Sequence, residues 1–348
     1  MKRPRSSRLL RVLADFQQVW IVTHDFPDPD AICAGWALYW LVKQRLDVAC
    51  RLVGGGDIVR AENRELVRLL SPPIELVTEL SLSDDIATVL VDGDPQANNH
   101  LLARIPALPN ANIDHHEDHA ATVEGVAFSD VRPNVVATVS IAGSYLREQA
   151  VEPTANLASG MLYAMRTETL GHETRYSSLD RDVLPWLAER ADLSKVAEIE
   201  NAPLPRNYYS DLALALQNAF VYDHAALCLL PRAEGPETVA EVADLLIRCE
   251  GIKRVMCGAL VGSDLMVSVR TGPEVSGAGR LAREVLDGIG SAGGHEHRAG
   301  GRVSNVATTE RIGEGLQQTL RARFLAACGI ERRRGVRLVA KREIVDNL

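Results

Sequence analysis

Three short apolar runs in the first half of the chain each end in a cluster of acids and histidines. They read VWIVTHDFPDPD, IATVLVDGDP and NANIDHH. A stretch with apolar residues at helical spacing, AICAGWALYWLVKQRL, lies between the first two. Such alternation favours a mostly parallel sheet with helices on both faces. Ligands of these sheets bind beyond the carboxyl ends of the strands, so we expect the three clusters to meet at one edge.

The chain has 348 residues, enough for two domains. The segment IENAPLPRNYYSDL, with two prolines among polar residues, predicts a linker or the rim of a connecting helix. Beyond it, HAALCLLP, VAEVADLLIRCEG and RVMCGALVG predict a strand, a helix and a strand of a smaller α/β unit. We therefore expect an α/β protein with three parts: a larger domain with a mostly parallel sheet flanked by helices over residues 1–192, a linker over 193–222, and a smaller α/β substrate-binding domain over 223–348.

Composition narrows the possible partners. The net charge of −8 disfavours a broad basic face for long duplex nucleic acid. The six cysteines are scattered without a C-x-x-C pair, as in a reduced cytoplasmic protein. No apolar run approaches the length of a membrane span. We expect a cytoplasmic protein that binds neither a membrane nor long duplexes.

The three polar clusters offer more ligands than one metal ion needs. The candidates are His24, Asp28, Asp30, Asp92, Asp94, Asp114, His115 and His116. Oxygen and nitrogen ligands without thiolate suit Mn²⁺, Mg²⁺ or Fe²⁺ better than structural Zn²⁺. Each cluster alone is a weak signal, since a histidine after a strand is usually structural and DGD is usually a turn. Their joint occurrence predicts two ions that share a bridging carboxylate, an arrangement used for attack on phosphorus.

Four motifs resemble those of the DHH phosphoesterase superfamily. HDFPDPDA is similar to its first motif, VDGD to its second and DHH to its third, while GGHEHRAGG resembles the glycine-histidine motif of the DHH-associated substrate domain. The superfamily includes RecJ exonucleases, family II inorganic pyrophosphatases, nano-RNase (oligoribonuclease)/pAp phosphatases and cyclic-dinucleotide phosphodiesterases. The match covers nearly the whole chain and indicates the superfamily much more specifically than the substrate.

The resemblance implies a role for each matched residue of the first domain. His24 and Asp28 would hold one ion, Asp30 and His115 would hold the other, and Asp92 would bridge them.

Two further residues would act beside the ions. The resemblance implies that His116 faces the substrate phosphate and that Asp114 orients an imidazole. The family usually supplies one more aspartate to the second ion in a T-D-T-like stretch. Here that stretch is MRTETLG, which places Glu168 at the ligand position. Glutamate has one more methylene group, so we expect it either to ligate with altered geometry or to leave the second ion weaker.

The second domain carries the expected substrate contacts. Arg270 lies at the end of a predicted strand, where the family places an arginine for a terminal phosphate or base. Gly293, Gly294 and His295 match the glycine-histidine motif, and the glycines would let backbone N–H groups approach an anion.

The sequence therefore predicts a Mn²⁺-dependent phosphoesterase with two ions, Mg²⁺ or Fe²⁺ being the alternatives. The expected substrates are short nucleotides: short single-stranded oligoribonucleotides, linear or cyclic dinucleotides, and pAp. Nano-RNase/pAp phosphatase-like and cyclic-dinucleotide phosphodiesterase members are the nearest models, and a homodimer is possible. Two alternatives stay open, a nucleotide-sensing module with weak catalysis and an inorganic pyro- or polyphosphatase. The GGH motif disfavours the second.

Overall fold

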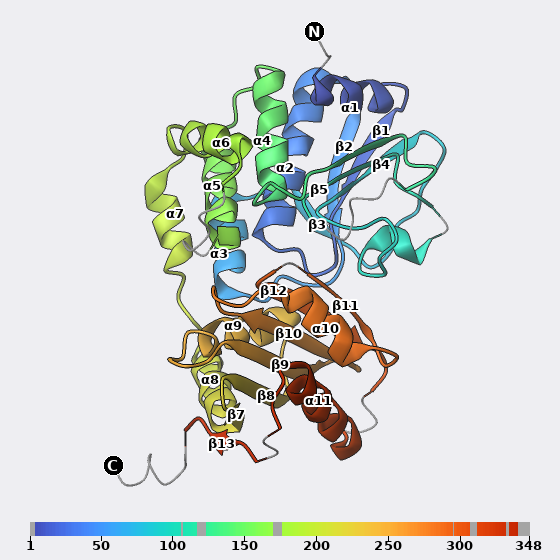
Figure 1. Ribbon diagram of the computed structural model, residues 1–348. Helices are drawn as coiled ribbons and strands as arrows, with labels where there is room; N and C mark the ends of the chain where they lie inside the picture. The colour runs from blue at the N-terminus through green and yellow to red at the C-terminus, as the bar shows by residue number, and fades with distance from the viewer. Residues whose placement is uncertain are drawn as a thin grey trace. The chain divides into compact units, whose positions relative to one another are not determined.

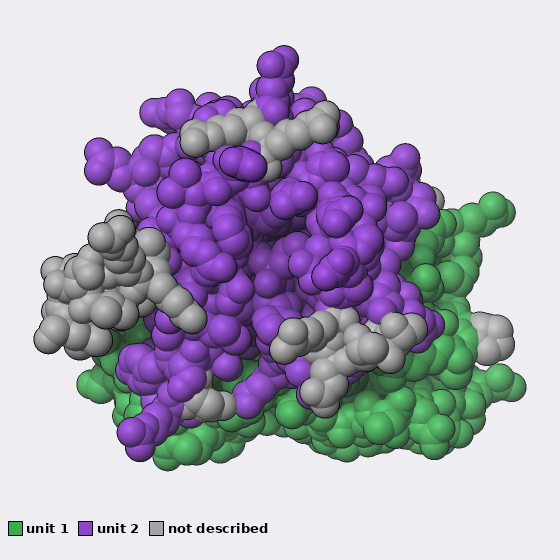
Figure 2. Space-filling model, turned by 90° about the horizontal axis from the view of Figure 1, so that it is seen from below, with its two compact units in different colours: residues 1–203 green, residues 204–348 purple. Residues whose placement is uncertain are grey.

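The computed structural model describes residues 4–105, 107–116, 123–169, 176–294, 296–306, 312–331 and 334–339. The chain divides into two compact units, residues 1–203 and 204–348, which Figure 2 colours separately. This division falls inside the segment 193–222 that was expected to be a linker. Much of that segment is helical, in α7 (Leu193–Glu200) and α8 (Arg206–Asn218).

Unit 1 is built on a six-stranded parallel sheet with the strand order β3-β2-β1-β4-β5-β6. The central strand β4 is buried along its whole length, as its continuous apolar run predicts for a parallel sheet. The expected α/β class is therefore confirmed for this unit. The strands are β1 (Gln18–Val22), β2 (Ala49–Gly54), β3 (Ile74–Leu76), β4 (Ile86–Val91), β5 (Ala111–Asp114) and β6 (Phe128–Val131).

The helices of unit 1 contribute to one large apolar core, and α2, α4 and α5 pack against one another within it (Figure 1). The opposite face of the sheet has a smaller cluster, in which Trp20 and Leu90 meet Leu80 and the short helix η1 (Leu101–Arg104). Among the described residues no α-helix joins that cluster, and η1 is its helical part. The α-helices are α1 (Arg5–Leu13), α2 (Pro29–Arg45), α3 (Ala61–Leu70), α4 (Thr138–Glu148), α5 (Ala155–Thr169), α6 (Ser178–Ala188) and α7.

Unit 2 is the predicted smaller α/β unit, with a seven-stranded mixed sheet of the order β11-β12-β10-β9-β8-β7-β13. Only the β8–β9 pair is parallel among its described strand pairs. Helices α10 and α11 contribute to one apolar cluster, and α8 and α9 to another. The strands are β7 (Ala219–Tyr222), β8 (Ala225–Arg232), β9 (Arg254–Val261), β10 (Asp264–Thr271), β11 (Ser291–Gly294), β12 (Arg298–Val303) and β13 (Val336–Arg337). The remaining helices are α9 (Pro236–Leu246), α10 (Ala278–Leu286) and α11 (Glu314–Ala327).

The three polar clusters follow β1, β4 and β5, which are neighbours in the sheet of unit 1. Parallel strands present their carboxyl ends at the same edge, so the clusters meet there as the sequence predicts. No helix within the described parts of the chain is long and apolar enough to cross a membrane.

Candidate metal centre

Two groups of possible metal ligands lie at this edge of the unit 1 sheet. His24, Asp28 and Asp92 form the first group, and Asp92, His115 and His116 form the second. Within each group the ligand atoms lie within 4.8 Å of one another. Asp92 belongs to both groups and is buried. The structure thus brings together five of the residues that the sequence singled out.

The imidazole of His24 is oriented by the backbone. Its Nδ1 donates a hydrogen bond of 2.8 Å to the carbonyl oxygen of Asp25. This leaves Nε2 facing two carboxylates, Oδ1 of Asp28 at 3.8 Å and Oδ2 of Asp92 at 3.7 Å. These distances are longer than hydrogen bonds. Although burial lowers the pKa of His24, the nearby negative carboxylates of Asp28 and Asp92 raise it to about 9.

His115 repeats this arrangement on the other side of Asp92. Its Nδ1 donates to the carbonyl oxygen of Val135 at 3.2 Å, and its Nε2 faces Oδ2 of Asp30 at 3.7 Å and Oδ1 of Asp92 at 3.8 Å. The two oxygens of Asp92 therefore face different histidines. A hydrogen bond on one ring nitrogen that leaves the other facing carboxylates is typical of histidine ligands.

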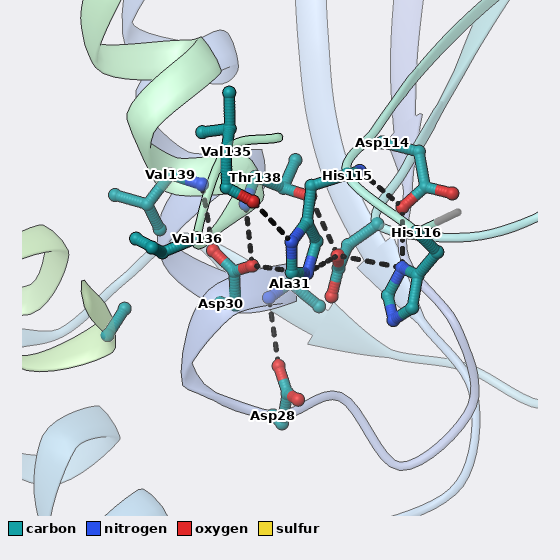
Figure 3. A network of polar contacts seen from close by, with 12 residues as sticks. Asp28, Asp30, Ala31, Asp114, His115, His116, Val135, Val136, Thr138 and Val139 are labelled. Carbon is teal, nitrogen blue, oxygen red and sulfur yellow. Dashed lines mark hydrogen bonds and ion pairs between the residues drawn. The ribbon is translucent and has the colours of Figure 1, made fainter. Parts of the chain in front are cut away.

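Asp30 is held by the first turn of α4 (Figure 3). The backbone N–H of Thr138 donates to its Oδ2 at 2.7 Å, and that of Val139 donates to its Oδ1 at 2.8 Å. Burial raises the pKa of Asp30 well above its usual range, and the negative charges of Asp92, Glu168 and Asp28 add to this effect. A divalent cation among these carboxylates would offset that accumulation of negative charge.

His116 is bound to Asp114. Its Nδ1 donates a hydrogen bond of 2.7 Å to Oδ1 of Asp114, the same oxygen that accepts the backbone N–H of His115 at 2.8 Å. Burial lowers the pKa of His116, but its hydrogen bond to Asp114 and the charges of Asp114, Asp92 and Glu168 raise it to about 10. Asp114 is fully buried and so holds the ring in a fixed orientation.

Glu168 lies near the end of α5 and is partly buried. Its charge raises the pKa of both Asp30 and His116, which places it close to the second group. Glu168 is not part of either group of mutually close ligand atoms identified among the described residues. Its role as a ligand therefore stays a prediction.

Comparison with known proteins supports the fold. No protein-family model matches the chain. An uncharacterized protein from Methanocaldococcus jannaschii is 28% identical over 317 residues, which cover 89% of this chain and 64% of that protein. The chain thus matches less than two thirds of its relative's length. A crystal structure of an exopolyphosphatase-related protein from Bacteroides fragilis superposes with a TM-score of 0.68 at 14% identity, covering 93% of this chain and 97% of that one.

The chain therefore shares the fold of that exopolyphosphatase-related protein. Its assignment to the DHH superfamily rests on the four sequence motifs and stays a prediction. A structure of exonuclease RecJ bound to manganese also aligns, with a TM-score of 0.47 and 15% identity over 99% of this chain and 97% of that chain. Because the identity is only 14%, the likeness to the exopolyphosphatase-related protein concerns the fold alone.

In unit 2, Arg270 is largely buried on β10. Its Nε donates to Oδ1 of Asp244 at 2.5 Å, and its Nη1 donates to Oγ of Ser268 at 2.7 Å. The arginine expected to hold substrate is therefore already ion-paired within unit 2. The nearby His297 has its Nδ1 3.2 Å from Oγ1 of Thr271.

The glycine motif lies on β11, where Gly293 pairs with Gly300 and Gly294 with Ala299 of β12. Gly294 has a φ of +140°, and a Cβ there would lie 2.4 Å from Cα of Ala299. The close approach of the two strands thus requires glycine at position 294. His295 lies outside the described residues.

Sequence reasoning missed two residues of unit 1 that lie beside the candidate metal centre. Thr138 has no motif to mark it, yet its hydroxyl donates to Oδ1 of Asp92 at 2.7 Å. His100 is buried and pairs with His24 in an isolated β-bridge. Its Nε2 bonds to the carbonyl oxygen of Asp94 at 3.0 Å and its Nδ1 accepts the N–H of Ala103. Both ring bonds lie within the segment after β4, and the backbone bridge to His24 joins this segment to the loop after β1.

Proposed function

We propose that this chain is a metal-dependent phosphoesterase that hydrolyses phosphodiester or phosphomonoester bonds of short nucleotides. The observation that carries the proposal is the position of Asp92. One of its carboxylate oxygens faces His24 and the other faces His115, and each histidine also faces a further aspartate. A carboxylate between two such sets of ligands is suited to bridge two cations.

The donor atoms fit divalent manganese, with Mg²⁺ or Fe²⁺ as alternatives. Both groups consist of imidazole nitrogens and carboxylate oxygens, and neither contains a thiolate. His24 and Asp28 would hold one ion, Asp30 and His115 the other, and Asp92 both. Cations bound there would act as Lewis acids towards a phosphoryl oxygen and would lower the pKa of a water molecule.

His116 is suited to contact the substrate. Of the three imidazoles in the centre its side chain is the most exposed, at 30% against 18% for His24 and 6% for His115. Asp114 accepts the hydrogen bond from its Nδ1, and its Nε2 would be the atom that contacts a phosphoryl oxygen. A protonated His116 would stabilise negative charge that develops on that oxygen.

The nucleotide part of the proposal rests on the resemblance of unit 2 to the DHH-associated domain. Arg270 and the glycine motif are its candidate contacts. Among the substrates, short single-stranded oligoribonucleotides, linear and cyclic dinucleotides and pAp are proposed equally. Polyphosphate is a further candidate, because the solved protein with a TM-score of 0.68 is described as exopolyphosphatase-related.

A substrate panel tests this function. The metal-free protein is supplied with Mn²⁺ and incubated with pApA, cyclic di-AMP, pAp, pyrophosphate and polyphosphate, and the products are separated by chromatography. We expect mononucleotide release, or release of phosphate from pAp, that chelation abolishes. Asp92→Asn should remove this activity. Asp84→Asn is the matched control. Asp84 is exposed and lies just before the first residue of β4, at the end of the strand opposite Asp92.

Other outcomes of the panel would replace the proposal. Cleavage of pyrophosphate or polyphosphate alone would make the chain an inorganic phosphatase. Tight binding of a dinucleotide without product would indicate a nucleotide-sensing module. Turnover that survives exhaustive chelation would exclude the metal centre as the site of catalysis.

A further inference from the structure

The first turn of α4 contacts two candidate metal ligands at once. Thr138 donates its backbone N–H to Oδ2 of Asp30 and its hydroxyl to Oδ1 of Asp92, both at 2.7 Å. Val139 donates its N–H to the other oxygen of Asp30. Thr138 lies 108 residues from Asp30 and 46 residues from Asp92 in the chain. The start of helix α4 thus joins the first turn of α2 to the residue that follows β4.

The bonds to Asp30 use backbone N–H groups at the start of α4 that a capping side chain would commonly accept. The first N–H groups of a helix have no partner within it, and an N-cap side chain commonly accepts one of them. The N-cap residue of α4 is Ala137, which has no polar side chain. The carboxylate of Asp30 takes two of these N–H groups instead, and the hydroxyl of Thr138 is directed at Asp92.

The hydroxyl determines how the Asp92 carboxylate is turned. The terminal torsion of an aspartate is soft, so packing alone orients its two oxygens poorly. Thr138 has a β-branched side chain with few rotamers, and it is fully buried. Its hydrogen bond occupies one lone pair of Oδ1. It thereby keeps Oδ1 on the side of His115 and Oδ2 on the side of His24.

We propose that Thr138 is a positioning residue for the metal centre. It orients Asp92 so that each carboxylate oxygen serves a different ion, and it links this orientation to Asp30 through the start of α4. The inference rests on the proposed two-ion function. A buried threonine that only fills space in the core would not affect metal binding. The proposal predicts that Thr138 does affect it.

Thr138→Val tests the role of the hydroxyl. Valine keeps the shape of the side chain and the backbone N–H to Asp30, and removes only the hydrogen bond to Asp92. Losing a partner of a metal ligand typically lowers metal affinity 10- to 100-fold. We expect a loss of this size in the binding of Mn²⁺ to the metal-free full-length protein. Titration followed by the electron paramagnetic resonance of free Mn²⁺ measures it.

Two further variants separate positioning from general destabilisation. Thr138→Ser keeps the hydroxyl and should bind Mn²⁺ with an affinity within about threefold of wild type, because the lost methyl group only loosens its rotamer. Ser144→Ala removes another buried hydroxyl of α4, one that bonds to the carbonyl of Ile141 and not to a ligand. It should leave Mn²⁺ affinity unchanged even if thermal stability falls.

The possible results distinguish the positioning role of Thr138 from the proposed two-ion function. If wild type and Thr138→Val bind two Mn²⁺ ions equally tightly, Thr138 is not a positioning residue. The proposed function would still stand in that case. Equal losses of affinity in Thr138→Ser and Thr138→Val would also overturn the positioning role, since the hydroxyl would then not matter. Wild type that binds no Mn²⁺ would overturn both. If Thr138→Val does not fold, Thr138→Ala, which also removes the hydroxyl, takes its place with the same expected loss and the same contradicting outcomes.

Discussion

Asp114 holds His116 through a hydrogen bond of 2.7 Å between Oδ1 of the carboxylate and Nδ1 of the ring. The carboxylate is fully buried, and the backbone N–H of His115 donates to the same oxygen. This geometry orients the most exposed imidazole of the centre without making Asp114 a ligand. The pair is suited to present the opposite ring nitrogen to a phosphoryl oxygen.

Asp114→Asn should therefore lower kcat and leave metal binding largely intact. The amide keeps the size of the side chain, but it weakens the charge-assisted bond and no longer favours a protonated His116. We expect a loss of about 10- to 100-fold in kcat, as for other residues that orient a functional imidazole. Steady-state kinetics and metal analysis of the same preparations measure both properties. Loss of bound Mn²⁺ would instead show that Asp114 supports the ligands themselves.

The contribution of Glu168 can be read from a Mn²⁺ titration of activity. If Glu168 ligates the second ion, Glu168→Asp should restore the family's usual side-chain length and shift the titration to lower Mn²⁺. Glu168→Ala should lose the second ion. Glu124→Ala, a change at an exposed glutamate of unit 1, should titrate like wild type. If all three variants match wild type, Glu168 is not a ligand and the second ion takes another one.

Arg270→Ala should act on substrate and not on metal. A lost charge-assisted contact to phosphate is worth roughly 1.5–3 kcal/mol, or one to two decades in KM. Because Arg270 is paired with Asp244, the change should also destabilise unit 2 by leaving that carboxylate without its partner. Arg321→Ala, at an exposed position of α11, is the control. A loss of stability with unchanged KM would make Arg270 a structural residue.

Gly294→Ala should destabilise unit 2 through its backbone. The φ of +140° is almost restricted to glycine, and occupying it with alanine costs about 1–3 kcal/mol before the overlap with Ala299 is counted. Gly300→Ala is the matched control, because a Cβ there meets only the carbonyl of Val267 at 3.8 Å. Urea unfolding followed by far-ultraviolet circular dichroism should show a lower midpoint for the first variant alone. Equal midpoints would mean that the two strands can move apart at position 294.

The α/β class and the meeting of the three clusters could be predicted from the sequence. Both depend on local patterns: an apolar run forms a buried parallel strand, and the residues that follow it lie at the carboxyl edge of the sheet. The sequence therefore placed His24, Asp92 and His115 in one region. On the face with Trp20 the described cluster includes the short helix η1 and residues of the segment 77–82, whereas the α-helices of this unit contribute to the other core. A short apolar loop has no regular spacing of apolar residues, so the sequence does not show that it will cover a face of the sheet.

The tertiary structure alone decided how these side chains are oriented. That Asp92 turns one oxygen towards each histidine depends on Thr138, which lies 46 residues further along the chain. The pairing of Arg270 with Asp244 likewise joins a strand to a helix 26 residues away. Hydrogen bonds have strict distance and angle requirements, and these are met only when the packing of distant elements fixes both partners. The sequence thus determined which groups gather at the sheet edge, and the folded packing determined which atoms face one another.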